Sequence, residues 1–414
     1  MKRIVLLIAL VVTLSATSLF AQTAKPEEVG LSSERLKLIH NLIERRIETR
    51  DISGAVTLVA RKGRVAYFEA QGLMDIETNK PMAKDAIFRI ASMTKPVIGV
   101  AVLMMIEEGK VRLSDPVSRF IPEFKELKVA VAQPNAGQAG GRGAAPAPRF
   151  YTVPAEREIT IRDLLTHTSG LVSGTISTAE AAKIQRKPGE TLADYIPRLG
   201  QVPLEFQPGS RWTYSPGAGF DTLGSVVEIV SGQNLDQFLR QRIFEPLGMK
   251  DTFFNISEPQ RARAATMYQK TANGLQKSPN QPAASTTYYS GGGGLSSTAD
   301  DYSRFAQMLV NGGQLNGKRL LSPRIVELMR SPYAADTLPG RAGGEASGLS
   351  VRVITDAVAR NTCLSNGSFG WQGAFGTHFW VDPKQKLVGL LMVQTSNQEM
   401  IRDFENAVLQ SIVE

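Results

Sequence analysis

The sequence has very few of the residues that build disulfides and metal centres. One cysteine, Cys363, and three histidines, His40, His167 and His378, occur among 414 residues. A single cysteine cannot form an intrachain disulfide, and it excludes a cysteine-based zinc or iron–sulfur centre. The histidines lie far apart and show none of the short two-ligand spacings of zinc sites. We therefore expect neither a bound metal nor a cofactor.

Blocks of like charge are absent as well. Lys and Arg total 47 against 39 Asp and Glu, which gives a net charge of +8, but no block of five like charges occurs. Because a nucleic-acid-binding arm is typically such a block, we expect a small-molecule substrate and no nucleic-acid partner. The basic balance is interpreted as a solubility feature, with binding to an anionic envelope surface as the alternative. At 42% hydrophobic residues, the chain can bury a full core.

The long hydrophobic run of this sequence lies at the N-terminus. Lys2 and Arg3 precede apolar residues 4–12, and small residues then lead to Ala21. This is the layout of a secretory signal peptide, and it is shorter than the about 20 apolar residues that span a bilayer. We expect residues 1–21 to be removed, leaving a secreted, periplasmic protein without a stable membrane anchor. Retention of the segment as an anchor is the alternative.

Both ends of the chain show the patterns of helices and antiparallel strands. From Ser32, a suitable N-cap, apolar residues recur at helical spacing; they are Leu36, Ile39, Ile43 and Ile47. Two β-rich runs follow, and a second pair lies near the C-terminus; the two predicted hairpins are 54–60 with 65–70, and 377–382 with 387–394. A last helix is predicted from Met400 to Glu414.

The middle of the chain shows helical patterns separated by long loops. The predicted helices are 97–108, 161–165, 218–230 and 235–243. The economical architecture is an α+β fold, in which one antiparallel sheet from both chain ends is flanked by helices and interrupted by a mainly helical region. The predicted parts are the sheet domain at 22–91 and 285–414 and the helical region at 92–284. Residues 131–149, rich in Ala, Gly and Pro, are predicted to be a flexible loop, either a plain linker or a flap near a pocket.

The strongest local candidate for chemistry is Ser92, which precedes the most apolar helical run. Proline is tolerated only in the first turn of a helix, so Pro96 indicates that the helix begins near Ser92, and Gly109 is suited to end it. Lys95 lies three residues on, along the same face. Burial there would lower the lysine pKa from its usual value of about 10.4, so that the amine could take the serine proton. The alternative is a serine N-cap beside a solvent-exposed lysine.

Other serine chemistries fit this sequence less well. Gly-x-Ser-x-Gly, the nucleophile elbow of the α/β-hydrolases, does not occur. A Ser-His-Asp triad would need a histidine as its base. His40 lies within the first predicted helix and His378 opens a predicted strand. We interpret the remaining candidate, His167, as a structural residue that bonds a turn.

Six motifs follow one another along the chain. They are SMTK at 92–95, LLTHTSGL at 164–171, PGSRWTYS at 208–215, FEPLGM at 244–249, GGGGLSST at 291–298, and GWQGA at 370–374 followed by WVDP at 380–383. In this order they resemble the penicilloyl-serine transferase superfamily, the class C β-lactamase-like serine hydrolases, from about Ser32 to the C-terminus. Within it the chain looks most like the family VIII carboxylesterases and the lovastatin-type acyltransferases, in which Trp-x-Gly replaces Lys-Thr-Gly. The resemblance implies a β-lactamase/transpeptidase-like fold.

The resemblance also implies a role for individual residues. Ser92 would be the acylated nucleophile, Lys95 its proton partner, and Tyr214 the base that passes protons to the leaving group and from the attacking water. The backbone N–H groups of Ser92 and Ala374 would form the oxyanion hole, in which each donor is worth about 3 kcal/mol. Trp371, with the neighbouring Gly373, would line the substrate pocket.

Two departures from the family pattern bear on the substrate. Trp371 stands where relatives carry the lysine of Lys-Thr-Gly, which holds an anionic carboxylate. Three arginines, Arg341, Arg352 and Arg360, are candidates to replace that cation. The second departure is Tyr214-Ser-Pro216 in place of Tyr-x-Asn, which removes an amide that would bond a substrate's acylamino group. Both changes favour neutral esters over β-lactams and peptides.

The sequence therefore predicts a secreted serine hydrolase that cleaves short-chain carboxylic esters through an acyl-serine at Ser92. A β-lactamase or D-Ala peptidase-like amidase is one alternative, and an acyltransferase to an alcohol is another. All share one acyl-enzyme and differ in the bond cleaved or in the acceptor. From a different class, an inactive envelope binding protein is the remaining alternative. Its nucleophile or base would be expected to be damaged, and here both are intact.

Overall fold

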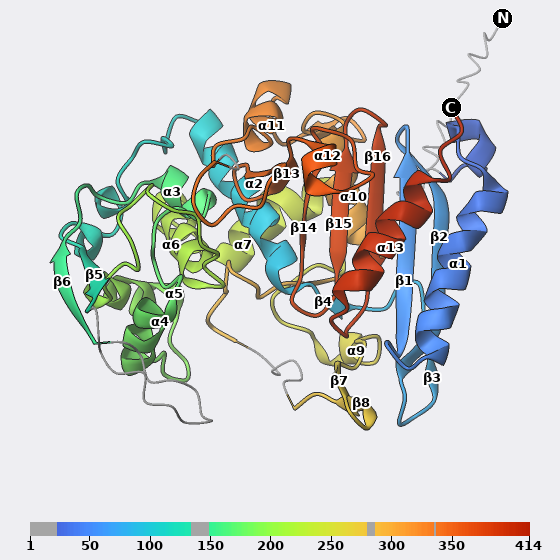
Figure 1. Cartoon of the computed structure of the whole chain (residues 1–414), viewed down its shortest axis with the longest axis horizontal. Coiled ribbons are helices and arrows are strands. Elements are labelled where there is room, and N and C mark those ends of the chain that lie inside the picture. Colours follow the sequence, from blue (N-terminus) through green and yellow to red (C-terminus); the bar gives the residue numbers. More distant parts are fainter. Residues whose placement is uncertain (1–22, 134–148, 280–285, 335–336) are drawn as a thin grey trace, which may run out of the picture.

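Strands from both ends of the chain form one eight-stranded antiparallel sheet in this computed structural model (Figure 1). The structure describes residues 23–133, 149–279, 286–334 and 337–414. The strand order is β12-β13-β14-β15-β16-β1-β2-β3. In chain order the strands are β1 (Gly54–Arg61), β2 (Arg64–Asp75), β3 (Lys80–Pro81), β12 (Glu345–Ser347), β13 (Arg352–Ile354), β14 (Phe369–Gln372), β15 (His378–Asp382) and β16 (Leu387–Met392). The sheet confirms the predicted fold class.

The two predicted hairpins lie side by side at the centre of the sheet. Strand β1 pairs with β2 within the first hairpin and with β16 of the second, where Val56 faces Met392. Strand β16 in turn pairs with β15. The first and last parts of the chain therefore form one sheet. The segment between β3 and β12 is inserted into the chain between strands of that sheet.

Alternating side chains on β1 divide the core into two layers. Val56, Leu58 and Ala60 belong to the large cluster between the sheet and the helical region. Ala55 and Val59 belong to the smaller cluster on the opposite face. Because successive side chains of a strand point to opposite faces, and both faces here are covered, β1 is buried along its whole length.

Helices from the chain ends cover one face of the sheet. The helices α1 (Ser33–Glu48) and α13 (Gln398–Leu409) pack against each other there. The side chain of Ser32 caps α1 by accepting from the Arg35 N–H at 3.3 Å, as the sequence predicted. The helix α10 (Ala299–Val310) contacts β1, β15 and β16 and belongs to the large cluster between the sheet and the helical region. Two further helices of this part of the chain are α11 (Pro323–Met329), which contacts α2, and α12 (Ala357–Arg360).

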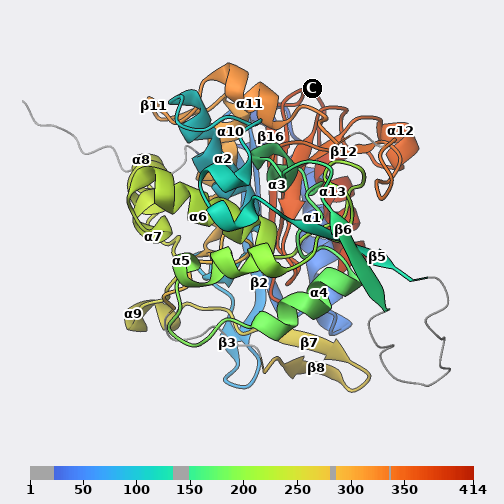
Figure 2. The ribbon, with the colours of Figure 1, turned by 90° about the vertical axis from the view of Figure 1, so that its left-hand side faces the viewer.

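The mainly helical region lies beside the sheet, and α2 runs between the two parts (Figures 1 and 2). Its helices are α2 (Thr94–Glu107), α3 (Ile161–Leu165), α4 (Thr175–Ala181), α5 (Leu192–Tyr195), α6 (Ala218–Ser231), α7 (Leu235–Leu239), α8 (Glu245–Leu247) and α9 (Glu258–Arg261). Four two-stranded sheets accompany them in the described residues; they are β4 (Phe88–Arg89) with β9 (Ser296–Ser297), β5 (Lys128–Ala132) with β6 (Phe150–Pro154), β7 (Tyr268–Thr271) with β8 (Gly274–Lys277), and β10 (Gln314–Leu315) with β11 (Lys318–Arg319).

One predicted boundary in this region is wrong. The predicted loop 131–149 begins too early, because Val131 and Ala132 belong to β5 and pair with Tyr151 and Phe150. Residues 134–148 of that loop, like the predicted signal peptide 1–21, lie outside the described residues. The predicted helix 235–243 is confirmed: α7 begins at Leu235 and continues directly into a π-helical turn at Arg240–Phe244.

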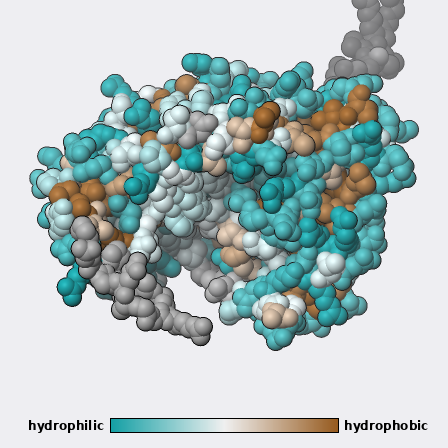
Figure 3. All heavy atoms as spheres, viewed as in Figure 1, coloured by the Kyte–Doolittle hydropathy of each residue, from teal (hydrophilic) through white to brown (hydrophobic). Residues whose placement is uncertain are grey.

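The surface shows hydrophobic side chains only in small, separate groups on the face drawn in Figure 3, where hydrophilic residues dominate. Within the described parts of the chain, no helix combines the length and the apolar character needed to cross a membrane. The apolar residues of these parts are used mainly in the two internal clusters.

Candidate active site

Ser92 lies on a strained turn immediately before the most deeply buried helix. Ala91 has a positive φ of 45°, a conformation that costs a residue with a side chain free energy and is found preferentially at functional sites. A 3₁₀ turn, Ala91–Met93, then leads into α2 at Thr94. Pro96 falls in the first turn, as predicted, and Gly109, with φ 73°, follows the helix end. Ser92 is therefore held at the helix N-terminus by the backbone on both sides.

Two side chains converge on the Ser92 hydroxyl. The phenol oxygen of Tyr214 lies 2.5 Å from Ser92 Oγ, and Lys95 Nζ lies 3.2 Å from it. Tyr214 comes from the loop that precedes α6, more than a hundred residues away in sequence. The structure thus brings together the three residues that the family resemblance assigns to catalysis.

Lys95 is completely buried and its donors are directed at fixed acceptors. Its Nζ lies 2.6 Å from the Pro216 carbonyl and 2.6 Å from the Gly292 carbonyl. Burial lowers the pKa of Lys95 to about 7, although the charge of Asp221 opposes this. A neutral amine has two N–H groups for the two carbonyls and one lone pair, which then faces Ser92 Oγ. Lys95 is thereby oriented as a proton acceptor from Ser92.

Tyr214 is positioned through its neighbour, Ser215. The Ser215 N–H donates to His167 Nδ1 at 3.3 Å, and Ser215 Oγ donates to the Leu171 carbonyl at 2.9 Å. Burial raises the pKa of Tyr214, and hydrogen bonds to Ser92 and Trp371 partly offset the rise. The phenol is therefore protonated at neutral pH, and Lys95 is the better base in the resting site.

His167 contacts the loop that carries Tyr214 and Ser215, and it makes no hydrogen bond to Ser92 in the described residues. Its ring is fully buried, and burial together with the nearby charges of Lys95 and Arg341 holds its pKa well below the usual value. The ring stacks on Trp371 with centroids 5.7 Å apart. The neutral ring accepts a hydrogen bond from the Ser215 N–H. This contact fits the structural role that the sequence analysis gives to His167.

Asp221 is a buried carboxylate behind the site that the sequence analysis did not single out. Its Oδ1 accepts from the Gly292 N–H at 2.8 Å and from Ser290 Oγ at 2.7 Å, and its Oδ2 accepts from Tyr288 Oη at 2.9 Å. Burial raises the pKa of Asp221, and these donors and Lys95 oppose the rise. A carboxylate within the apolar pattern of the predicted helix 218–230 was the signal that could have identified it.

The turn between β14 and β15 approaches Ser92 from the sheet. Thr377 Oγ1 donates to the Ile90 carbonyl at 3.2 Å, and the Gly373 N–H donates to the Thr377 carbonyl at 2.7 Å. A Cβ on Gly373 would lie 2.5 Å from the Ile90 carbonyl oxygen, so only glycine allows this approach. The next residue, Ala374, lines the Ser92 pocket with its side chain exposed.

The pocket in front of Ser92 has a volume of about 400 Å³, a size suited to a small ligand. Trp212, Tyr214 and Trp371 supply its aromatic lining, and Gly373 and Ala374 lie at the β14–β15 turn. The three arginines considered from the sequence as substitutes for the missing lysine all line it as well; they are Arg341, Arg352 and Arg360.

Comparisons with known proteins show the family of this chain. The family model described as Beta-lactamase matches residues 39–413. Protein Rv1367c of Mycobacterium tuberculosis is 39% identical over 364 residues, which cover 83% of this chain and 86% of that protein. Esterase EstB of Burkholderia gladioli is 30% identical over 386 residues, which cover 87% of this chain and 90% of EstB.

A solved structure extends the likeness to three dimensions. EstCE1, described as a hydrolase with promiscuous acyltransferase activity, superposes with a TM-score of 0.74 at 27% identity, over 91% of this chain and 99% of EstCE1. The chain belongs to the beta-lactamase family and is a serine hydrolase of that family. The family, the fold and the hydrolytic class expected from the sequence are confirmed.

Proposed function

We propose that this serine hydrolase cleaves short carboxylic esters through an acyl-enzyme at Ser92. The observation that carries the proposal is the placing of Ser92 Oγ between Lys95 Nζ, at 3.2 Å, and Tyr214 Oη, at 2.5 Å, inside a pocket lined by Trp371. A serine hydroxyl needs a base to become a nucleophile, and a lysine with a pKa of about 7 supplies one at neutral pH.

In the acylation step Ser92 Oγ attacks the ester carbonyl carbon while its proton passes to Lys95 Nζ. The N–H groups of Ser92 and Ala374 are assigned to the tetrahedral oxyanion, where preorganised donors are most effective. When the C–O bond of the alcohol breaks, Tyr214 gives its phenol proton to the leaving oxygen. The acyl-enzyme then holds a lysine cation, with Nζ 5.0 Å from the centroid of the tyrosine ring, beside a phenolate.

In the deacylation step the Tyr214 phenolate takes a proton from water and the hydroxide attacks the acyl carbon. The bond to Ser92 Oγ breaks, and the departing oxygen recovers its proton from Lys95. All three residues return to their starting states, and one ester and one water have become one acid and one alcohol. Lys95 thus accepts a proton in acylation and donates it in deacylation, and Tyr214 does the reverse.

Acyl transfer to an alcohol is the second candidate activity. EstCE1, to which this chain is similar, is described as a hydrolase with promiscuous acyltransferase activity. An alcohol that enters in place of water would be activated by Tyr214 in the same way. Adding a short alcohol to the assay and measuring the new ester against the released acid separates transfer from hydrolysis.

The location proposed for the enzyme is outside the cytoplasm, in the periplasm. The proposal depends on Lys2, Arg3 and the apolar run 4–12, which match the order of a signal peptide. Fractionation of cells that express the full chain, with N-terminal sequencing of the product, tests it. A product that begins near residue 22 in the periplasmic fraction supports secretion, and an uncleaved cytoplasmic product contradicts it.

The activity is tested with p-nitrophenyl butyrate and the chromogenic cephalosporin nitrocefin. We expect rapid ester hydrolysis that is lost in Ser92→Ala and kept in Ser210→Ala, a matched change on an exposed loop. Efficient nitrocefin cleavage with poor ester turnover would favour the β-lactamase alternative. Ester hydrolysis that survives in Ser92→Ala would overturn the assignment of the nucleophile.

A further inference from the structure

One wall of the Ser92 pocket carries a group of three arginines, Arg341, Arg352 and Arg360, here called the arginine cluster. Arg341 precedes β12, Arg352 lies on β13, and Arg360 ends α12. All three face the same carboxylate, Glu345 on β12, at nitrogen–oxygen distances of 3.0 Å, 3.8 Å and 2.9 Å respectively. Residues from separate elements have therefore been gathered beside the nucleophile.

The cluster has more positive charge than its carboxylates neutralise. Glu345 is shared by all three guanidinium groups, and Glu405 on α13 lies 3.5 Å from Arg352. Glu405 also pairs with the buried ring of His378 at 2.9 Å. Three arginine cations thus face two carboxylates, which leaves an excess of one positive charge among these five groups. Mutual repulsion with Arg352 and Arg360 adds to burial in lowering the pKa of Arg341.

Two arginines of the cluster have donors without a hydrogen-bond partner among the described residues. Arg341 is only 2% exposed, and its Nε has no hydrogen-bond partner among the described residues. Arg352 makes ion pairs with Glu345 and Glu405, but no hydrogen bond from it is found in the described part of the chain, and its side chain is 21% exposed. Arg360 donates through Nε at 2.9 Å, and its side chain is 38% exposed. An unpaired donor on a buried cation costs free energy unless a ligand binds it.

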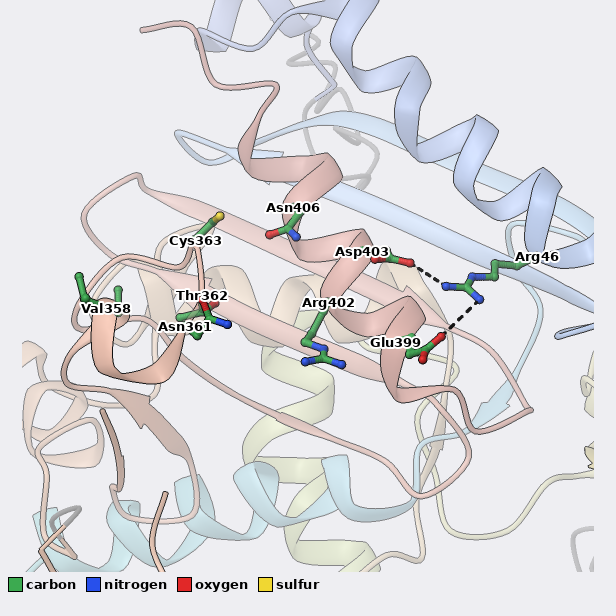
Figure 4. Close-up of a pocket in the computed structure, with 10 residues that line it drawn as sticks. Arg46, Val358, Asn361, Thr362, Cys363, Glu399, Arg402, Asp403 and Asn406 are labelled. Carbon is green, nitrogen blue, oxygen red and sulfur yellow. Dashed lines mark hydrogen bonds and ion pairs between the residues drawn. The ribbon is translucent and has the colours of Figure 1, made fainter. Parts of the chain in front are cut away.

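A second hollow adjoins the Ser92 pocket and shares part of its lining. Arg352, Arg360 and Gln372 line this second hollow, which also has Arg402 of α13 in its wall. Figure 4 shows a neighbouring pocket that shares Asn361, Thr362 and Arg402 with this hollow, and in which Arg46 pairs with Asp403 and Glu399. A substrate at Ser92 can therefore extend an anionic end along a cationic wall.

We propose that the arginine cluster binds a carboxylate of the substrate, so that the preferred substrates are esters that carry a carboxylate as well as the ester bond. The proposal rests on the ester hydrolysis proposed above and specifies its substrate class, replacing the neutral esters that the sequence favours by esters with a carboxylate. Guanidinium groups bind carboxylates with two parallel hydrogen bonds. The cluster thereby restores, from another position, the cation that is lost where Trp371 stands.

Two pairs of esters test the proposal and locate the carboxylate. In the first pair the acyl part differs: mono-p-nitrophenyl glutarate against p-nitrophenyl pentanoate, which have acyl chains of equal length. In the second pair the alcohol part differs: p-carboxyphenyl butyrate against p-methylphenyl butyrate. The readout is the ratio of kcat/KM for the anionic and the neutral ester, in wild type and in variants, at low and high salt.

We expect one of the two anionic esters to be preferred, and the preference to fall about tenfold in Arg360→Gln, the size of effect typical of one hydrogen bond to a charged group. Arg324→Gln, which removes an exposed cation on α11 that does not line the Ser92 pocket, is the matched control and keeps most of the preference. High salt should weaken the preference in the wild type.

Binding without turnover separates the two proposals. Calorimetry with the Ser92→Ala protein measures the affinity for monomethyl glutarate and for methyl pentanoate, and it needs no catalysis. We expect only the anionic ester to bind measurably, and Arg360→Gln in the same background to weaken it about tenfold. Ser92-dependent hydrolysis with no preference for either anionic ester, and no such binding, would overturn the inference and leave ester hydrolysis standing. Binding without any ester hydrolysis would overturn the proposed activity instead.

Discussion

Lys95 and Asp221 are connected through a single residue, Gly292. The Gly292 N–H donates to Asp221 Oδ1 at 2.8 Å, and the Gly292 carbonyl accepts from Lys95 Nζ at 2.6 Å. Asp221 therefore holds the carbonyl that orients the amine, and its charge raises the lysine pKa against the effect of burial. We assign Asp221 as a positioning residue for the proton acceptor of Ser92.

Replacement of Asp221 by asparagine should shift the pH dependence of the enzyme. The amide oxygen can keep the Gly292 bond, and the amide nitrogen can donate to Tyr288 Oη, so the site keeps its shape. Without the negative charge, the pKa of Lys95 falls further, and the acid limb of kcat/KM should move to lower pH. Asp301→Asn, a buried carboxylate bonded to Thr252, is the matched control and should leave the limb in place.

Truncation of the same residue should instead damage the fold locally. Asp221→Ala leaves the Gly292 N–H and the hydroxyls of Ser290 and Tyr288 without their acceptor. Each unpaired buried donor costs about 1–3 kcal/mol in the free energy of unfolding. If Asp221→Asn and Asp221→Ala were equally active and had the wild-type acid limb, Asp221 would have no role in positioning Lys95.

The wild-type enzyme should lose activity as the pH falls through about 7. Lys95 has a pKa of about 7 and accepts the Ser92 proton only in its neutral form. Below that pH the protonated fraction grows, and kcat/KM for p-nitrophenyl butyrate should fall about tenfold per pH unit. Lys95→Arg puts a permanently charged group in this place that cannot act as a base, so kcat/KM should fall by a factor of about a hundred or more at every pH. A flat profile from pH 5 to pH 8 in the wild type would contradict this role of Lys95.

The β14–β15 turn should be sensitive at Gly373 and tolerant at Ala374. A Cβ on Gly373 would lie 2.2 Å from Thr377 Oγ1 and 2.5 Å from the Ile90 carbonyl oxygen, so Gly373→Ala must move the turn. If the Ala374 N–H binds the oxyanion, kcat should fall about a hundredfold. Ala374→Ser changes only an exposed side chain and should keep most of the activity. The opposite pattern in steady-state kinetics would remove this turn from the oxyanion hole.

His167 should be replaceable by asparagine with modest loss. Its positive φ of 60° suits asparagine, and an amide oxygen can accept the Ser215 N–H as Nδ1 does. Removal of a general base costs about a hundredfold or more, and we expect a much smaller loss in His167→Asn. His167→Ala, which leaves the Ser215 N–H unpaired beneath Trp371, should lower the Tm more than His167→Asn. A hundredfold loss in a folded His167→Asn protein would assign the base to His167.

Local patterns were sufficient to predict the elements that carry the nucleophile. Pro96 and Gly109 fix the two ends of α2 through backbone geometry alone, and Ser32 fixes the start of α1. The two hairpins could be predicted because their strands are long and apolar. The pairing of β1 with β16 required only that both chain ends share one sheet.

Contacts between distant segments could not be predicted in the same way. The strands β12 and β13 have three residues each, too few to show an alternating pattern. Arg352 and Arg360 therefore meet Glu345 through tertiary pairing and not through spacing. Asp221 reaches Lys95 only because Gly292 packs against Gly217, where a Cβ would lie 2.6 Å from the Gly217 Cα. These contacts join residues that are far apart in the sequence, so local patterns do not predict them.

The most direct test is to trap the acyl-enzyme. In Tyr214→Phe the group that activates water is lost while Ser92 and Lys95 remain, so deacylation should slow by about a hundredfold or more. After brief reaction with p-nitrophenyl butyrate, peptide mass spectrometry should find one butyryl group on Ser92, with a matching burst of p-nitrophenol. A label on another residue, or butyrate release at the wild-type rate without an adduct, would contradict an acyl-serine mechanism at Ser92.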